Sequence, residues 1–237
     1  MNFAIVIAGG VGNRMGMDIP KQFIHVYDKP VIIYTLEGFE KHPEIDGIGV
    51  VCLSGWEDAL EKYAKAYSIT KLKWIVLGGE TGQESIRNGV YRLREDAEDS
   101  DIAIIHDGIR PMVDSSVLSD CIRVCSTYGS GVTATRFTEQ IFRVNDDGVT
   151  TREYIPRDSV MKLATPQAYN FGLLYGAYKK AFEEKTGIYG SSYTNTMMVD
   201  LGYTLHLAAG SDKNIKLTTP DDLEQFKAYL RMESESK

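Results

Sequence analysis

The feature that most constrains the fold is the regular alternation of apolar runs and amphipathic stretches over the first half of the chain. Each apolar run has the length of a buried strand, and each amphipathic stretch has apolar residues at helical spacing. The predicted strands are Phe3–Ala8, Gly47–Leu53, Lys73–Leu77 and Ile102–His106, and the predicted helices are Val31–Lys41, Glu57–Tyr67, Thr81–Arg94 and Ser115–Ser126. Strands that alternate with helices pair mostly in parallel, so this order predicts an α/β fold with helices on both faces of the sheet.

The pattern changes after Thr135. Two β-prone runs, Gln140–Val144 and Val149–Tyr154, flank an Asp-Gly turn, and this arrangement is typical of a hairpin. The hairpin is polar, so we expect it to project from the sheet as an arm of about residues 138–156. An isolated two-stranded ribbon is marginally stable in water, so the arm needs a partner surface.

The remaining elements follow the arm without a linker or an internal repeat, so residues 1–237 are expected to form a single domain. The predicted elements are helices Phe171–Glu184 and Tyr193–Leu201, a strand Thr204–Ala208, and a last helix with Thr219 as N-cap and Pro220 at its first position. Residues Met232–Lys237 are expected to be frayed.

Composition excludes several classes of protein. Lys and Arg number 26 against 33 Asp and Glu, so the net charge is −7, and the chain lacks the basic face that non-specific nucleic-acid binding requires. No apolar run approaches the roughly 18 residues of a membrane span, and the N-terminus has no signal-peptide pattern. Cys52, Cys121 and Cys125 show no CxxC spacing, so we expect buried, reduced thiols and a cytoplasmic location.

The first predicted strand ends in a glycine-rich loop, residues 8–16, with the sequence AGGVGNRMG. In open α/β sheets the ligand binds at the carboxyl ends of strands, and glycines let backbone N–H groups approach an anion closely. The loop is not a Walker A motif, and Met15 stands where a dinucleotide-binding loop has its third glycine. The cations Arg14 and Lys21 instead favour a phosphate site, although a surface turn with two solvated cations is the alternative interpretation.

Further strand ends carry charged motifs. Asp107 follows the fourth strand, where a carboxylate is placed to hold Mg²⁺ beside a triphosphate, and a structural ion pair with Arg110 is the alternative. Lys216 is the single cation of residues 214–218. It is a candidate phosphate-binding residue, and the alternative interpretation is a solvated lysine on an exposed strand edge. Tyr175 and Lys179 have the spacing of the short-chain dehydrogenase pair, but without a matching cofactor loop they indicate a solvated helix face.

Taken in order, these segments resemble the cytidylyltransferases that act on 2-C-methyl-D-erythritol 4-phosphate and on ribitol 5-phosphate. The segments that carry the resemblance span nearly the whole chain: residues 8–23, 28–37, 78–89, 106–111, Arg157, residues 165–167 and 214–223. The resemblance implies a Rossmann-like nucleotide-binding sheet, CTP as donor, Mg²⁺ as cofactor and a homodimer whose hairpin arms embrace. It also implies in-line attack by a polyol or sugar phosphate on the α-phosphorus of CTP, with release of pyrophosphate.

The resemblance assigns roles to individual residues. As catalytic groups it implies Arg14, Lys21 and Lys216, which would neutralise the triphosphate and its transition state. As metal ligands it implies Asp107, with Asp212. The implied nucleotide-binding residues are Ala8, Gly9, Gly10, Gly12, Gly79 and Ser85. The implied acceptor-binding residues are Arg110, Gln140, Thr194 and, from the arm of a second subunit, Arg157.

Three positions depart from the family pattern: Gly82 replaces an arginine, Gln140 a substrate-contacting threonine and Asn195 an aspartate. Two of these positions belong to the predicted acceptor site, so the resemblance supports CTP as the nucleotide donor more firmly than it identifies the acceptor. The first loop and Asp28-Lys29-Pro30 favour ribitol 5-phosphate, whereas residues 156–158 and 164–167 fit the methylerythritol branch of isoprenoid precursor synthesis about as well. A third sugar phosphate or polyol phosphate also stays open as the acceptor.

Two functions of other classes also stay open. A nicotinamide-dependent oxidoreductase would use the glycine-rich loop for pyrophosphate, and the failed glycine fingerprint argues against it. A non-catalytic nucleotide-binding module is the second, and the presence of all four charged residues Arg14, Lys21, Asp107 and Lys216 argues against that.

Overall fold

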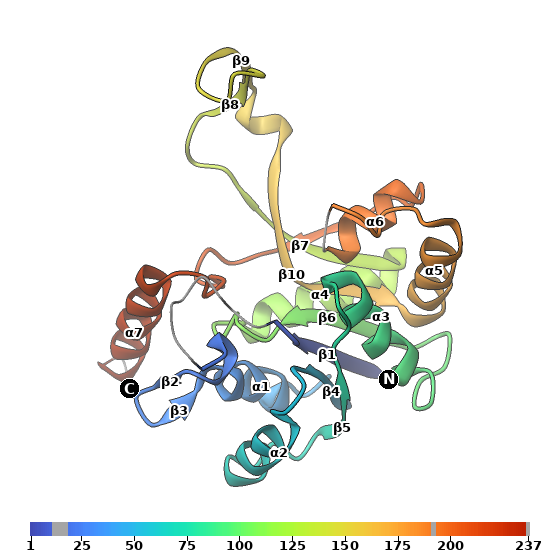
Figure 1. Ribbon diagram of the computed structural model, residues 1–237, viewed down its shortest axis with the longest axis vertical. Coiled ribbons are helices and arrows are strands. Elements are labelled where there is room, and N and C mark those ends of the chain that lie inside the picture. Colours follow the sequence, from blue (N-terminus) through green and yellow to red (C-terminus); the bar gives the residue numbers. More distant parts are fainter. Residues whose placement is uncertain (11–18, 191–192, 236–237) are drawn as a thin grey trace.

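The computed structural model describes residues 1–10, 19–190 and 193–235. At its centre lies a seven-stranded sheet in the order β11-β7-β10-β6-β1-β4-β5 (Figure 1). Its strands are β1 (Asn2–Ala8), β4 (Gly47–Cys52), β5 (Leu72–Leu77), β6 (Ile102–Asp107), β7 (Ser130–Arg136), β10 (Met161–Asn170) and β11 (Leu207–Ala209). Neighbouring strands pair in parallel except at β10, which is antiparallel to both β6 and β7. The predicted α/β class with a mostly parallel sheet is confirmed.

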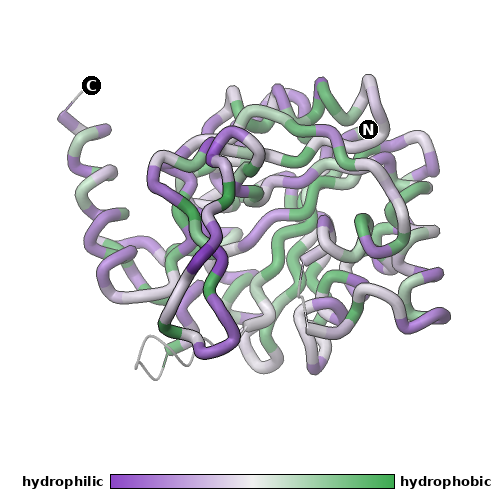
Figure 2. The backbone as a smooth tube through the Cα atoms, turned by 90° about the horizontal axis from the view of Figure 1, so that it is seen from above, coloured by the Kyte–Doolittle hydropathy of each residue, from purple (hydrophilic) through white to green (hydrophobic). Residues whose placement is uncertain are grey.

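Helices cover both faces of this sheet. They are α1 (Val31–Lys41), α2 (Glu57–Ala66), α3 (Gly82–Leu93), α4 (Ser115–Tyr128), α5 (Phe171–Glu184), α6 (Thr194–Asp200) and α7 (Pro220–Glu235). Alternate residues of β1 enter two separate apolar cores, with Ala4 and Val6 packed in the core of α1, α2 and α4 and with Phe3 and Ile5 in the core of α3, α5 and α6. Figure 2 shows the hydrophobic residues concentrated along the central strands.

Local sequence signals set several helix boundaries. The predicted capping box of α3 is present: Glu84 N–H donates to Thr81 Oγ1 at 3.1 Å, and Thr81 N–H donates to a Glu84 carboxylate oxygen at 3.0 Å. The bounds of α1 and α5 agree with the prediction to the residue. None of the helices within the described ranges has the length and apolar character needed to cross a bilayer. The three cysteines are unpaired and buried, as expected.

The predicted hairpin is present as β8 (Ile141–Val144) and β9 (Thr151–Ile155), and it stands away from the sheet as an arm (Figure 1). The chain enters the arm from β7 and returns through the 3-10 helix η3 (Arg157–Ser159) into β10. Arg136 pairs with Met161 where the two strands leave the sheet. The arm carries four large apolar side chains that are more than half exposed, namely Phe142, Val144, Val149 and Tyr154.

A small unit packs beside the sheet, under α7. It comprises the 3-10 helix η2 (Lys21–Phe23) and the two-stranded ribbon of β2 (His25–Val26) and β3 (Lys29–Pro30). Val26, Ile109, Leu217 and Phe226 share one apolar cluster there. This cluster fixes the segment after the glycine-rich loop against the segment that carries Lys216.

Three expectations need correction. Strands β7 and β10 were not predicted, because β7 is rich in small residues and β10 contains Pro166, which usually argues against a central strand. The strand predicted at Thr204–Ala208 is confined to Leu207–Ala209. Fraying from Met232 is wrong, because α7 continues to Glu235; residues 236–237 lie outside the described residues.

Candidate active site

The carboxyl ends of β1, β4 and β5 form a cradle lined by glycine backbone. A Cβ atom at Gly9 would lie 3.4 Å from Gly78 Cα and 3.5 Å from Ser85 Oγ. Gly79 N–H donates to Ser85 Oγ at 3.0 Å, and a side chain at Gly79 would meet Glu84 Cβ at 2.4 Å. The predicted nucleotide-binding residues Ala8, Gly9, Gly10, Gly79 and Ser85 are therefore contributed by strand ends and a helix start that lie side by side. Gly12 and Arg14 lie outside the described residues.

Gln22 holds the start of the glycine-rich loop. Its side chain is buried, and its amide nitrogen donates to the carbonyl oxygens of Ala8 at 2.8 Å and Gly10 at 3.1 Å. Lys21 precedes it in η2, so the same short helix that pins the loop also carries the predicted cation. Gln22 lies in the segment 8–23 that carries the resemblance, but its sequence position alone indicates no role.

Asp107 is the centre of a charged cluster at the carboxyl end of β6. Its carboxylate accepts from Arg110 Nε at 2.9 Å and from Lys216 Nζ at 3.2 Å. The Asp107 backbone N–H donates to Thr165 Oγ1 at 3.0 Å. Although burial alone would raise the pKa of Asp107, Lys216 and Arg110 outweigh it and lower that pKa, so the carboxylate is charged at neutral pH. The structure thus unites Asp107, Arg110 and Lys216, which the sequence identified separately.

Backbone contacts bring Lys216 to this cluster. Leu217 N–H donates to Ile109 O at 2.9 Å, and Arg110 Nη1 donates to Asn214 O at 2.7 Å, so the loop of residues 214–217 is tied to the segment after β6. Lys216 Nζ lies 5.5 Å from the ring centre of Tyr193. A lysine held by a carboxylate and an aromatic face is a preorganised cation rather than a solvated strand-edge residue.

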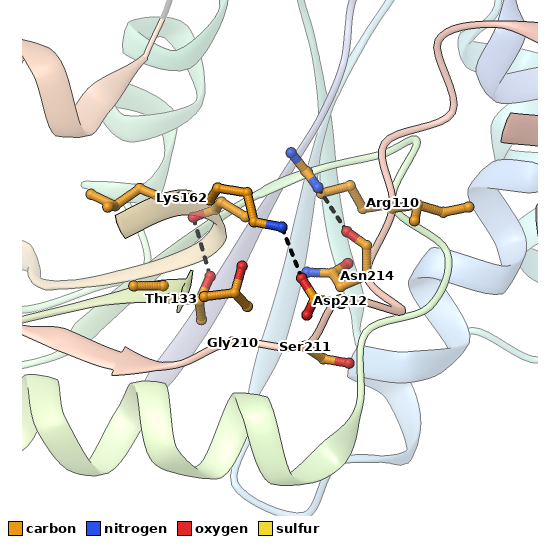
Figure 3. Close-up of a pocket in the computed structure, with 12 residues that line it drawn as sticks. Arg110, Thr133, Lys162, Gly210, Ser211, Asp212 and Asn214 are labelled. Carbon is orange, nitrogen blue, oxygen red and sulfur yellow. Dashed lines mark hydrogen bonds and ion pairs between the residues drawn. The ribbon is translucent and has the colours of Figure 1, made fainter. Parts of the chain in front are cut away.

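A pocket of about 270 Å³ lies next to the cluster, at the carboxyl ends of β7 and β11. Figure 3 shows Arg110 and Lys162 reaching toward it from opposite sides. Lys162 Nζ is 3.0 Å from the carboxylate of Asp212, the second predicted metal ligand. Sequence reasoning did not find Lys162, because a single lysine in the unpredicted strand β10 carries no motif.

Of the other predicted acceptor-binding residues, Thr194 follows Tyr193, whose ring faces Lys216, and two lie on the arm. Thr194 is buried, and its hydroxyl is 2.9 Å from the hydroxyl of Tyr178, which donates to Gln83 at 3.0 Å. Gln140 and Arg157 are exposed on the arm, where Arg157 donates to the carbonyl oxygen of Thr138 at 2.8 Å. Their proposed contacts with an acceptor stay predictions.

The carboxylates near the site fit Mg²⁺ better than a metal ion that takes all of its ligands from the protein. Within the described ranges no three His, Cys, Asp or Glu side chains gather as a metal site. Mg²⁺ commonly takes one or two carboxylates and completes its octahedron with water and substrate phosphates. Asp107 and Asp212 offer oxygens of that kind, although each accepts from a lysine in this structure.

His106 lies behind Asp107 and is fully buried. Its Nε2 is 3.1 Å from Arg110 O, an acceptor, so the ring donates through Nε2 in its neutral form. Burial lowers the pKa of His106 from 6.5 to about 4. The unfolded chain therefore binds a proton at this residue over a pH range in which the folded chain does not.

This difference predicts a loss of stability in mild acid. The contribution of neutral His106 is complete above about pH 6.5 and is lost as the pH falls toward 4, with about 2 kcal/mol lost between pH 7 and pH 5. Urea unfolding at several pH values, in the wild type and in His106→Gln, measures it. The difference between the two proteins isolates this histidine, and parallel pH profiles would contradict the prediction.

Comparison with known proteins then decides the family. The family described as "IspD: 2-C-methyl-D-erythritol 4-phosphate cytidylyltransferase" matches residues 2–232. This chain belongs to that family of cytidylyltransferases. A ribitol-5-phosphate cytidylyltransferase of Lacticaseibacillus paracasei is 54% identical, covering 96% of this chain and 97% of that protein. A 2-C-methyl-D-erythritol 4-phosphate cytidylyltransferase of Clostridium novyi is 33% identical, covering 97% of this chain and 96% of the relative.

Solved structures of cytidylyltransferases have the same fold. The 4-diphosphocytidyl-2C-methyl-D-erythritol synthase of Anaerococcus prevotii superposes with a TM-score of 0.83 at 25% identity, covering 97% of this chain and 96% of that one. The Francisella tularensis 2-C-methyl-D-erythritol 4-phosphate cytidylyltransferase gives a TM-score of 0.79 at 26% identity, covering 96% and 98%. The cytidylyltransferase fold and the enzyme class expected from the sequence are confirmed.

Proposed function

We propose that this cytidylyltransferase joins the CMP part of CTP to ribitol 5-phosphate and so forms CDP-ribitol and pyrophosphate. The observation that carries the choice of acceptor is the 54% identity, over 96% of the chain, to a ribitol-5-phosphate cytidylyltransferase. Relatives named for 2-C-methyl-D-erythritol 4-phosphate are 33–36% identical. The CTP half is supported by the glycine cradle and the cations beside it.

The chemistry requires positioning and charge more than proton transfer. A phosphate oxygen of the acceptor attacks the α-phosphorus of CTP, a new P–O bond forms there, and the bond from the α-phosphorus to the bridging oxygen breaks. Pyrophosphate leaves with that electron pair. Lys21, Lys216 and Arg14 are the proposed cations that stabilise the charge spread over the phosphates in the transition state. Lys216 is held ready by Asp107, so little reorganisation is needed when the phosphates arrive.

Mg²⁺ is the proposed cofactor, and Asp107 is its proposed ligand. It would neutralise phosphate oxygens of CTP when bound. Asp107→Asn keeps the size of the side chain but removes its charge, so we expect the Mg²⁺ concentration for half-maximal activity to rise about tenfold or more. A magnesium titration of pyrophosphate release measures this, with Asp221→Asn on the exposed start of α7 as a control of equal charge change. An unchanged midpoint would place the metal ligand elsewhere.

The proposed assembly is a homodimer formed through the arm. The arm is a two-stranded ribbon that stands away from the central sheet (Figure 1). It exposes four large apolar side chains, namely Phe142, Val144, Val149 and Tyr154. Such a ribbon gains stability when a second surface covers its apolar side chains, and symmetric association of two copies is the commonest way to provide one. Arg157 and Gln140 would then reach the acceptor site of the neighbouring subunit.

A substrate screen tests the function directly. Pyrophosphate release is measured with CTP, Mg²⁺ and, in turn, ribitol 5-phosphate, 2-C-methyl-D-erythritol 4-phosphate and sn-glycerol 3-phosphate, and the product is identified by mass. We expect the highest kcat/KM with ribitol 5-phosphate and the mass of CDP-ribitol. The second acceptor is the alternative function, which the family description favours. Turnover confined to it would replace our proposal.

An oxidoreductase and a non-catalytic module have no support beyond the original sequence pattern. The ring of Tyr175, whose hydroxyl would have to donate a proton in a dehydrogenase, packs against Tyr91 of α3 and Phe171 of α5. The four charged residues expected of a transferase, Arg14, Lys21, Asp107 and Lys216, are all present in the chain, and Lys216 pairs with Asp107. CTP as donor and three unpaired cysteines support a cytoplasmic location.

A further inference from the structure

The pocket beside Asp107 is lined by several polar side chains in addition to the cations that would bind phosphate. Arg110 and Asn214 line one part of it, Lys162 and Asp212 another, and the hydroxyl-bearing residues Thr133, Thr135 and Ser211 complete its polar wall. At about 270 Å³ it is smaller than the roughly 300–1,000 Å³ typical of sites for drug-sized ligands. Its size suits a short acyclic chain rather than a nucleotide.

Asn214 supplies an independent sign that a ligand belongs there. The residue is 4% exposed and lines the pocket, and its Nδ2 donates to Thr165 O at 2.6 Å. Because Thr165 O accepts, the amide must turn its nitrogen toward it and its oxygen away. That oxygen, Oδ1, is buried without a hydrogen-bond partner among the described residues. Buried polar atoms are nearly always paired in native proteins, so this acceptor calls for a donor such as a hydroxyl.

The ion pair of Lys162 and Asp212 offers the complementary groups. Both side chains are exposed, Lys162 to 44% and Asp212 to 71%, and they meet at 3.0 Å on the wall opposite Arg110 (Figure 3). A carboxylate accepts from hydroxyl groups, and an ammonium group donates to hydroxyl oxygens. An ion pair that faces a small pocket can therefore bind neighbouring hydroxyls of one chain through both of its partners.

We infer that Lys162, with Asp212, binds the hydroxyl chain of the acceptor and so determines which polyol phosphate is used. The acceptor phosphate lies at Arg110 and Lys216, and the carbon chain extends past Arg110 into the pocket. A hydroxyl there would reach Asn214 Oδ1 once neighbouring side chains shift, because this oxygen has almost no accessible surface in the structure. This inference rests on the proposed function, because it assumes a polyol phosphate acceptor. It assigns Asp212 to the acceptor rather than to the metal.

Lys162→Met tests the inference, because methionine keeps the apolar stem and removes the ammonium group. We expect the KM for ribitol 5-phosphate to rise about tenfold to a hundredfold, the range that corresponds to losing a hydrogen bond to a charged group, with the KM for CTP unchanged. Inhibition by sn-glycerol 3-phosphate, which has the phosphate but only a short chain, should keep its inhibition constant. Lys213→Met is the matched control, since Lys213 is an exposed lysine next to Asp212 that does not line the pocket.

The outcomes separate the inference from the proposed function. If the wild type turns over ribitol 5-phosphate and Lys162→Met leaves its KM unchanged, only the inference fails. It also fails if the inhibition constant of glycerol 3-phosphate rises equally, or if the sole effect is a lower magnesium requirement, as expected when a metal ligand is freed. If the wild type turns over no polyol phosphate, the proposed function fails and the inference with it. Retained selectivity in Lys162→Arg would show that the charge is the relevant property.

Discussion

Replacing Lys216 by methionine is expected to lower kcat by about 10²–10³-fold while the protein stays folded, because loss of one preorganised charge contact to a transition state has an effect of that size. The fold should persist for a structural reason. Asp107 keeps its ion pair with Arg110 at 2.9 Å, so the variant leaves no unpaired buried carboxylate. Steady-state pyrophosphate release gives kcat, and thermal unfolding reports the fold.

The matched control for this prediction is again Lys213→Met. It removes the same charge from the same loop but from an exposed residue, so its kcat should equal that of the wild type. A Lys216→Met enzyme with nearly full turnover would show that the lysine serves the structure of the cluster and not the reaction.

Mixed dimers are expected to recover activity that neither parent variant has. Lys21→Ala damages the donor half of a site, and Arg157→Ala damages the contribution from the arm. If each site combines the core of one subunit with the arm of the other, a dimer of one Lys21→Ala chain and one Arg157→Ala chain contains one intact site. Random pairing of equal amounts then gives about a quarter of wild-type activity.

The contrary outcomes are clear for this experiment as well. A mixture that recovers nothing, although sedimentation shows exchange of subunits, would place Arg157 in the site of its own subunit. An intact protein that sediments as a monomer at assay concentration would remove the shared site altogether. Deletion of residues 140–154 provides the companion measurement, since the shortened chain should bind CTP as a monomer but fail to turn over.

Local signals explain why much of the fold could be predicted. The capping box at Thr81 and the apolar runs of β1, β4, β5 and β6 act within a few residues, so one sequence suffices to find them. Strand β10 is different. It holds Pro166 and shifts register between Leu163 and Gln167, so its membership of the sheet depends on β6 and β7 rather than on its own pattern.

The same distinction applies to the candidate site. Asp107, Arg110 and Lys216 could be identified singly, because each lies in a short motif after a predicted strand and the family resemblance assigns each motif a role. Their meeting could not be predicted, because Lys216 is joined to Asp107 across 109 positions by contacts such as that of Leu217 with Ile109. Gln22 acts through buried hydrogen bonds to the carbonyl oxygens of the glycine-rich loop, and Lys162 acts through its ion pair with Asp212. Neither arrangement produces a recognisable sequence pattern.

The arm leaves and rejoins the sheet through paired neighbours, Arg136 and Met161, so its two ends are adjacent. A segment attached in this way is an insertion that can be lengthened, shortened or exchanged without altering the distance that the core must bridge. The nucleotide-binding half and the arm are thus free to diverge at different rates. If the proposed dimer forms through the arm, exchanging residues 137–160 between relatives should transfer the pairing preference of one enzyme to the catalytic core of another.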